Sequence, residues 1–172
     1  YGTVRAVISV CDSMNYLTDE EDLEYVFALV NNYLDPGGLF IFDMNTVHKY
    51  RDVIGDTTIA EDREDGSFIW ENSYDVENGL NVYELALFLP REDGLYEKCE
   101  EEHVQRAYPL DVIKGMIEKA GMELVAVYDA YTRNPGDENS ERLTFIVREH
   151  GKSAENDYHG IIPERAEKKS EE

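Results

Sequence analysis

The sequence predicts an α/β fold in which an open sheet carries an inserted antiparallel β meander. Residues 4–10 and 39–42 are almost continuously apolar, a pattern typical of strands that are buried on both faces of a parallel sheet. The stretch between them has helical periodicity, which completes a strand–helix–strand unit. From residue 57 to residue 107 apolar residues alternate with polar ones, and glycine-containing turns interrupt them.

The first unit places two groups of polar residues at one edge of the predicted sheet. Thr18 and Glu21 have the spacing of a capping box, so a helix should begin there. Pro36, Gly37 and Gly38 predict a break between this helix and the second strand. A right-handed crossover makes the two strands parallel, so the polar residues that follow each strand should meet.

The insert is expected to contain four strands, at residues 57–61, 67–74, 80–89 and 95–107. Pro109, an apolar stripe and Gly121 then predict a second helix over residues 109–120. Two further strands are expected at residues 123–128 and 142–148. Residues 1–150 would thus form one domain, whereas the charged tail at 151–172 lacks apolar periodicity and is expected to be poorly ordered.

Composition disfavours several classes of partner. A formal net charge of −22 repels a phosphate backbone, so we expect no nucleic acid partner. No apolar stretch approaches the roughly 20 residues that span a bilayer, so no membrane partner is expected either. Cys11 and Cys99 are too far apart for a disulfide framework or a zinc motif, which favours a cytoplasmic location.

The remaining histidines and the first residue add two expectations. His48, His150 and His159 have no metal-ligand spacing with nearby carboxylates or thiols, so we predict no metal. The chain starts at Tyr1 without a methionine and only a few residues before an apolar strand, which suggests a truncated start.

Short polar side chains follow both predicted parallel strands. Asp12, Ser13 and Asn15 come after the first strand, and Asp43 and Asn45 after the second. Such groups can hold a charged ligand and fix the positions of reacting atoms. The alternative is that Asp12 and Ser13 only cap and turn the chain. Because a similar polar group, Asp43 and Asn45, follows the second strand, we favour a functional site over a purely structural role.

The insert supplies candidates of a different kind. Strand alternation places His103 on one face with Glu101 and Gln105, and Arg106 on the other face. A neutral histidine could take a proton from an amine or a hydroxyl group, although a cross-strand hydrogen-bonded pair is an equal alternative. Three aromatic residues could line a substrate wall or belong to an ordinary core: Trp70, Tyr74 and Tyr83. Cys11 is expected to be a small buried hydrophobe, not a nucleophile.

Three segments together resemble the carboxyl-terminal half of a class I S-adenosylmethionine-dependent methyltransferase. They are Cys-Asp-Ser-Met-Asn-Tyr-Leu at 11–17, Leu-Asp-Pro-Gly-Gly-Leu-Phe-Ile-Phe-Asp-Met-Asn at 34–45, and Glu-Glu-His-Val-Gln-Arg-Ala-Tyr at 101–108. The similarity covers residues 4–148 and is close to a bacterial subgroup of the small-molecule type. It implies a partial Rossmann-like methyltransferase sheet with an antiparallel insert.

The resemblance also implies a cofactor, S-adenosyl-L-methionine, and a small-molecule methyl acceptor. The residues that it places at the cofactor are Cys11, Asp12, Ser13 and Asn15. The residues that it places at the acceptor are Tyr16, Asp43, Asn45, Trp70 and Arg106. His103 and Asp12 would then carry the catalytic roles, with His103 as the general base.

One part of the family pattern is absent from this sequence. Members of the family carry a glycine-rich loop and an acidic residue upstream of the matched region, and these hold the methionine and ribose portions of the cofactor. Gly37 and Gly38 precede a strand and cannot be that loop. We therefore expect a truncated, inactive enzyme that self-associates through the exposed edge of its first strand. The alternative is a non-enzymatic interaction module that pairs through the same strand.

Overall fold

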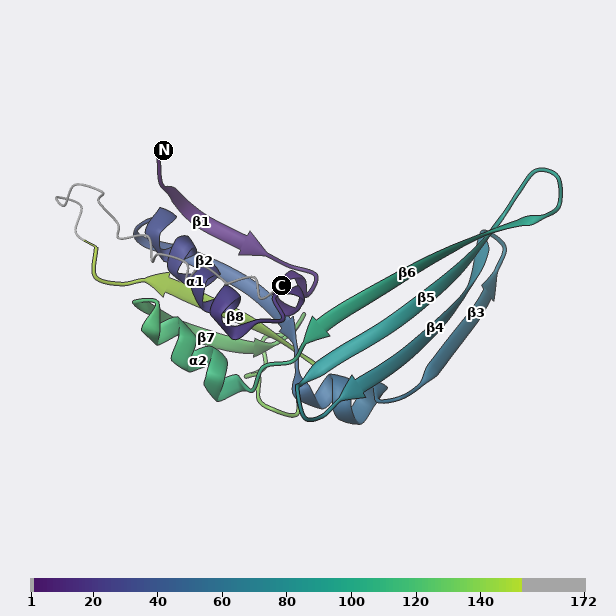
Figure 1. Cartoon of the computed structure of the whole chain (residues 1–172). Helices are drawn as coiled ribbons and strands as arrows, with labels where there is room; N and C mark the ends of the chain where they lie inside the picture. The colour runs from purple at the N-terminus through teal and green to yellow at the C-terminus, as the bar shows by residue number, and fades with distance from the viewer. Residues whose placement is uncertain (1, 153–172) are drawn as a thin grey trace, which may run out of the picture.

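The computed structural model describes residues 2–152, so the expected poorly ordered tail lies almost wholly outside the described residues. Within this range the chain forms two four-stranded sheets, with the strand orders β1-β2-β8-β7 and β3-β4-β5-β6 (Figure 1). The second sheet extends away from the first as a long curved arm (Figure 1). The predicted α/β fold with an antiparallel insert is confirmed.

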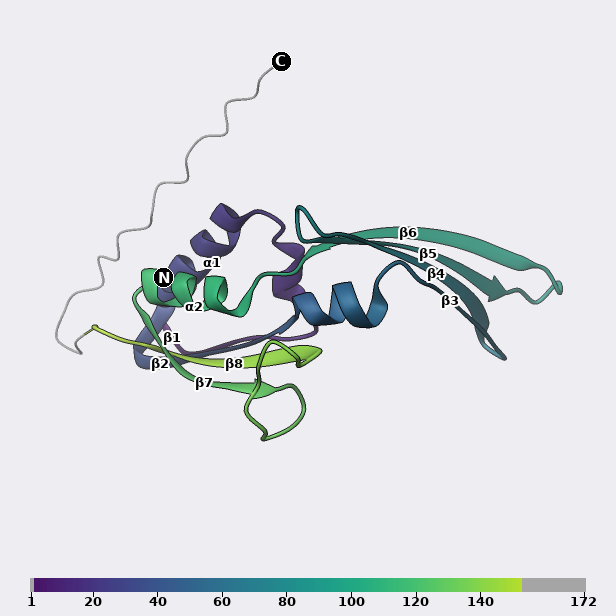
Figure 2. The same ribbon diagram turned by 90° about the horizontal axis from the view of Figure 1, so that it is seen from below.

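The first sheet combines parallel and antiparallel pairing. β1 (Val4–Ser9) and β2 (Leu34–Asn45) are parallel, as predicted. β8 (Arg142–Glu149) runs antiparallel to β2, and β7 (Met122–Asp129) runs antiparallel to β8. Both helices, α1 (Glu20–Tyr33) and α2 (Leu110–Lys119), lie on the same face of this sheet (Figure 2). The sheet is therefore covered by described helices on one face only.

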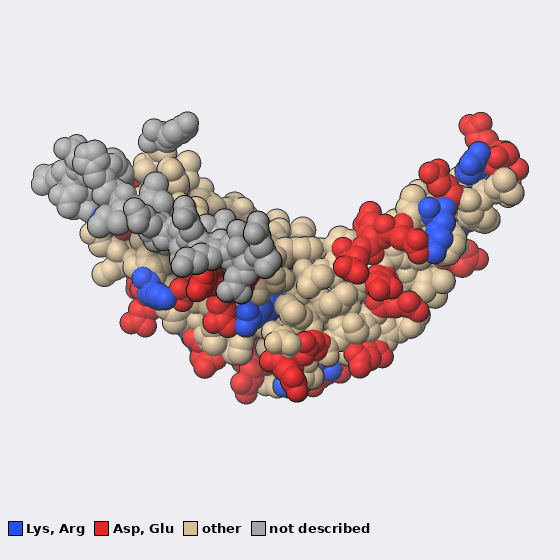
Figure 3. Space-filling model, viewed as in Figure 1, with Lys and Arg blue, Asp and Glu red and all other residues tan. Residues whose placement is uncertain are grey.

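Acidic side chains dominate the charged surface. On the face that Figure 3 shows, Asp and Glu side chains lie over both parts of the molecule, with small groups of Lys and Arg among them. This distribution follows from the composition, which has 38 Asp and Glu residues against 16 Lys and Arg residues. No continuous basic surface forms among the described residues on this face.

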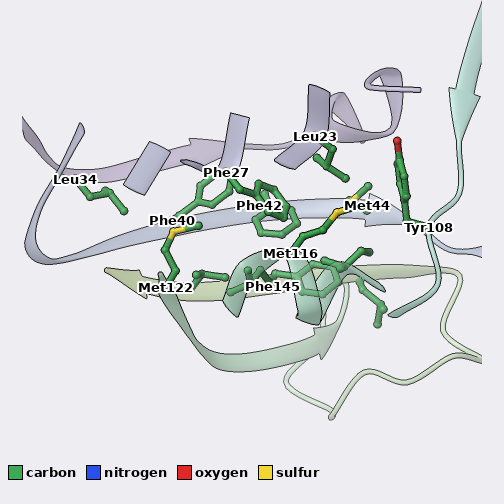
Figure 4. Packing of buried hydrophobic residues seen from close by; sticks show 14 residues of the cluster. Leu23, Phe27, Leu34, Phe40, Phe42, Met44, Tyr108, Met116, Met122 and Phe145 are labelled. Carbon is green, nitrogen blue, oxygen red and sulfur yellow. The ribbon is translucent and has the colours of Figure 1, made fainter. Parts of the chain in front are cut away.

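The hydrophobic core lies between the helix-covered face of the first sheet and the two helices (Figure 4). Phe42 stacks between Phe40 and Phe145, with ring centroids 4.6 and 4.7 Å apart, and Phe27 of α1 packs against Phe40 and Phe42. Met116 of α2 belongs to the same buried cluster. Aromatic rings that are fully buried in this way contribute about 1.5–3 kcal/mol each relative to exposure, so this cluster anchors β2 and β8.

The prediction that β1 is buried was wrong. Val4, Ile8 and Val10 are 45%, 65% and 52% exposed. Val4 and Ile8 alternate with Val7, which packs against the core, so they lie on the face that no described helix covers. β1 is also an edge strand that pairs only with β2 among the described residues. An apolar strand is thus left at an open sheet edge.

Two local predictions also need correction. The cap of α1 is Asp19 and not Thr18, since the Asp19 carboxylate accepts a hydrogen bond of 3.1 Å from the Glu21 N–H. Pro36–Gly38 do not interrupt β2 but lie within it, at a shift in its register with β1. A Cβ atom on Gly38 would lie 2.9 Å from the Asp35 carbonyl oxygen, so this bulge requires glycine there.

The insert contains the four predicted strands in antiparallel order: β3 (Thr58–Arg63), β4 (Gly66–Asp75), β5 (Leu80–Pro90) and β6 (Tyr96–Arg106). Two short helical elements were not predicted. The 3₁₀-helix η1 (Ser13–Tyr16) follows β1, and the π-helix η2 (Lys49–Ile54) joins β2 to the insert. Both lie where the two sheets meet, and π-helical turns are frequent at functional sites.

Candidate functional site

The turn after β1 has an unusual backbone conformation. Cys11 and Asp12 have φ angles of 61° and 50°, in the left-handed region that few non-glycine residues adopt. The buried carboxylate of Asp43 accepts hydrogen bonds from the N–H groups of Cys11 (3.3 Å) and Asp12 (2.7 Å). The end of β2 therefore holds the turn at the end of β1, and the two predicted polar groups do meet.

Asp12 connects three separate parts of the chain. Its Oδ1 accepts a 2.8 Å hydrogen bond from Nη2 of Arg142, the first residue of β8, and its Oδ2 accepts one of 2.7 Å from Nε2 of Gln105 on β6. Arg142 also reaches Asp43, at 3.4 Å. Charge-assisted hydrogen bonds of this kind are about twice as strong as neutral ones, so Asp12 joins the first sheet to the insert.

Tyr50 of η2 continues this network in the interior. Its buried hydroxyl donates to Oε1 of Gln105 at 2.6 Å and accepts from Nδ2 of Asn45 at 2.9 Å. Burial raises the pKa of Tyr50, so the hydroxyl stays protonated and can donate. Lys49 donates to Oδ1 of Asn45 at 3.0 Å, and burial lowers the pKa of Lys49. Asn45 is thus a link in a polar network, and the residue is only 5% exposed.

The other strand-end residues differ in their access to a ligand. Asn15 is fully buried, and it donates to the carbonyl oxygens of Asn45 (3.1 Å) and Arg106 (2.9 Å) while accepting from the Asn45 N–H (2.9 Å). It holds η1 to β2 and β6 and can act on a ligand only through the position of that turn. Ser13 donates to the Val10 carbonyl oxygen at 2.7 Å. Cys11 is exposed, which contradicts its expected burial, because the left-handed turn carries it out of the sheet.

His103 lies in a group of four residues that we call the Tyr16–His103 cluster: Tyr16, Tyr83, Glu101 and His103. The Tyr16 hydroxyl is 2.8 Å from Nδ1 of His103 and 3.1 Å from the Tyr83 hydroxyl. Nε2 of His103 is 3.2 Å from the Glu101 carboxylate, and the rings of Tyr83 and His103 stack with centroids 4.5 Å apart. An antiparallel register that sets Tyr83 opposite His103 produces this arrangement.

The cluster has one consistent hydrogen-bond direction when Glu101 is ionised and His103 is neutral. A carboxylate only accepts, so His103 must donate to it from Nε2 and must accept at Nδ1. Tyr16 then donates to His103 and accepts from Tyr83. Burial and the hydrogen bond with Tyr16 raise the pKa of Tyr83, which keeps its hydroxyl proton in place. A proton that reaches the Tyr16 hydroxyl from outside can therefore pass on to Nδ1 of His103.

Trp70 joins this group, whereas Arg106 does not. The Trp70 ring lies 5.0 Å from that of Tyr83, and its buried indole N–H has no hydrogen-bond partner among residues 2–152. Arg106 is on the opposite face of β6, where it donates to Thr18 and Glu20 at the start of α1. Strand alternation predicted that separation of Arg106 from His103. The third predicted aromatic residue, Tyr74, stacks on Tyr50 instead.

Sequence patterns did not identify several residues of the site. Gln105 was placed on the His103 face, but nothing local indicated its partners Asp12 and Tyr50. Arg142 is the first residue of the last strand, and no sequence signal connects it with Asp12. Metal binding has no support in the described part of the chain, where no group of three or more His, Cys, Asp or Glu side chains is arranged to hold an ion. No described helix is long and apolar enough to cross a membrane.

Comparison with known proteins gives this geometry a context. No protein-family model matches the chain. It is 31% identical over 144 residues to YqeM of Bacillus subtilis, a presumed methyltransferase, and the match covers 84% of this chain and 58% of YqeM. A second presumed methyltransferase, from Geobacillus sp., is 29% identical over 149 residues, which is 86% of this chain and 60% of that protein.

A solved structure extends the likeness to three dimensions. An S-adenosylmethionine-dependent methyltransferase from Clostridium acetobutylicum matches with a TM-score of 0.81 and 29% identity, over 87% of this chain and 60% of that one. The chain therefore has the fold of the class I S-adenosylmethionine-dependent methyltransferases. The chain spans about 60% of the length of the relatives it matches.

Proposed function

We propose that this chain carries the acceptor side of an enzyme that transfers a methyl group from S-adenosyl-L-methionine to a small molecule. The fold supports methyl transfer in general. The observation that carries the proposal for a small-molecule acceptor is the Tyr16–His103 cluster, in which an aromatic wall and a hydrogen-bonded histidine lie together. A net charge of −22 supports a small molecule over nucleic acid and agrees with the cytoplasmic location that we propose.

His103 would act as a general base through Tyr16. Both ring nitrogens of His103 already have partners, so an incoming amine or hydroxyl group meets the oxygens of Tyr16 and Tyr83 first. Tyr16 is 43% exposed, which makes it accessible to such a group. A proton given to this pair can be relayed to Nδ1 of His103, and the resulting imidazolium is stabilised by Glu101.

The turn after β1 would hold the methyl donor. S-adenosyl-L-methionine supplies the methyl group and carries a positive sulfonium when bound. Cys11 and Ser13 are exposed at this turn, and the backbone there is held by Asp43, so their oxygen and sulfur atoms are available to a cation. Asp12 is already paired with Arg142 and would fix the geometry of the turn. The exposed oxygen and sulfur atoms at this turn thus fit the positively charged sulfonium end of the cofactor.

The proposal is tested by cofactor binding and methyl release. If the reading frame upstream of Tyr1 encodes a strand, a glycine-rich loop and a helix, the completed protein should be assayed. Isothermal titration with S-adenosylhomocysteine, followed by a methyl-release screen over small amines and alcohols, should detect both steps. A completed protein that does not bind S-adenosylhomocysteine would refute the proposal.

A second candidate function rests on the exposed edge of β1. Its apolar side chains are accessible and its outer backbone groups pair with no described strand. Such an edge can accept a strand from another chain, which would make this chain an interaction module. A natural start codon close to Tyr1, preceded by a stop codon, would favour this alternative.

A further inference from the structure

A cavity of about 640 Å³ lies beside η2 and apart from the Tyr16–His103 cluster. It is bounded by the end of β2, η2, the start of α2 and the start of β8, and no member of the cluster lines it. Its floor consists of core side chains: Met44, Ile113, Leu143 and Phe145. A cavity of this volume with an apolar floor is typical of small-molecule sites.

Its polar rim contains a histidine that is oriented by a carboxylate. Nδ1 of His48 is 3.0 Å from Oδ2 of Asp52, one turn later in the chain. Arg51 donates to the same carboxylate from Nε and Nη2, both at 2.8 Å. The hydrogen bonds from Arg51 and then from His48 hold the pKa of Asp52 well below its usual range. An ionised carboxylate only accepts, so a neutral His48 donates to it from Nδ1 and has Nε2 as an acceptor, and Nε2 has no partner among residues 2–152.

The charges on the rim favour a neutral ligand with a hydrogen-bond donor. Two cationic residues, Arg51 and Lys114, line the cavity together with three acidic residues, Asp52, Asp111 and Glu138. Because charges of both signs line the cavity and nearly cancel, a full anion or a full cation gains little net electrostatic attraction there. A weakly acidic hydroxyl can donate to Nε2 of His48. The apolar residues of the floor suit an aromatic body.

We propose that this cavity binds a small phenol, with its ring on the apolar floor and its hydroxyl hydrogen-bonded to Nε2 of His48. An aromatic hydroxyl has a pKa of about 10, as in tyrosine, and is a stronger hydrogen-bond donor than an aliphatic alcohol. The inference does not depend on methyl transfer, because it concerns binding at residues that the proposed mechanism does not use.

The test is a titration of the 172-residue chain with 4-methylphenol, in which the NMR signals of the histidine rings report binding. We expect His48 signals to shift with a dissociation constant of about 1 mM, in the range of ligands this small. The comparison ligand is 4-methylanisole, which has the same ring but no O–H donor. It should bind at least about tenfold more weakly, the value of one hydrogen bond.

Two variants locate the site. Binding to both variants is read from the NMR signals of 4-methylphenol, because His48→Ala has no His48 ring. His48→Ala should weaken 4-methylphenol binding about tenfold, and His103→Ala should leave it unchanged, because His103 does not line the cavity. Absence of any shift at His48 would overturn the proposal, as would equal binding of 4-methylphenol and 4-methylanisole. Loss of binding in His103→Ala with retention in His48→Ala would place the phenol at the Tyr16–His103 cluster and would also overturn it.

Discussion

The hydroxyl of Tyr16 lies 2.8 Å from Nδ1 of His103, although 87 residues separate them in the chain. Tyr16 ends the 3₁₀-helix after the first strand of the first sheet, and His103 lies on the last strand of the insert. The contact therefore joins the two sheets at an accessible point. It gives the histidine a fixed orientation, which is what proton transfer to a single nitrogen requires.

The first prediction concerns His103. In the completed protein, His103→Ala should lower turnover by about 10²-fold, the low end for a lost general base, and leave S-adenosylhomocysteine affinity nearly unchanged. Isothermal titration and a methyl-release assay separate the two effects. The matched control is His150→Ala, since His150 is exposed and lies outside the cluster. Unchanged turnover in His103→Ala would leave His103 as an ordinary cross-strand residue.

The second prediction concerns the relay through Tyr16. Tyr16→Phe removes one hydroxyl and keeps the ring, so it should lower turnover in the same direction as His103→Ala. Because the two residues act in one chain, the double variant should be little slower than the slower single variant. Turnover losses that multiply in the double variant would show that Tyr16 and His103 act independently.

The third prediction concerns the turn that Asp12 holds. Asp12→Ala removes the partner of Arg142 and Gln105 and should cost about 2 kcal/mol of folding stability, typical of lost hydrogen bonds to a charged group. In the completed protein it should also weaken cofactor binding or lower turnover at saturating cofactor. Urea denaturation and titration measure these effects. The control Asp137→Ala changes an exposed loop carboxylate and should have little effect on either.

The fourth prediction concerns alkaline pH. Burial raises the pKa of Tyr108 to about 12, and it raises the pKa values of Tyr50 and Tyr83 above their ordinary value of 10.0. Stability from a raised pKa is fully present below the unfolded value and is lost as pH rises through the folded value. Stability should therefore fall from about pH 10 upward. An alkaline titration should show tyrosinate absorbance rising at the same pH at which circular dichroism reports unfolding. Full ionisation of the tyrosines in a protein that stays folded would contradict the prediction.

The fifth prediction concerns the edge of β1. The isolated chain should self-associate, and Ile8→Lys should reduce the association because a charge on an edge strand opposes pairing. Sedimentation velocity measures both. Val76→Lys is the control, because Val76 is 69% exposed but lies in a turn of the insert. A monomer at all concentrations would count against pairing through β1.

The elements of this fold were predictable because their signals are local. Apolar runs marked β1 and β2, alternation with glycine turns marked β3–β6, and Pro109 and Gly121 bracketed α2. Each signal depends on residues within one element, so a single sequence contains it. For the same reason, alternation along β6 correctly placed His103 and Arg106 on opposite faces of that strand.

Only the tertiary structure decided which of these residues meet. Tyr16 with His103, and Asp12 with Arg142, are pairs that no periodicity links, because their distance depends on how the two sheets are joined. The burial of β1 was mispredicted for the same reason, since an apolar strand is buried only if the topology supplies neighbours on its edges and faces. Composition and periodicity determine what a segment can form. Its partners are determined by the packing of the whole chain.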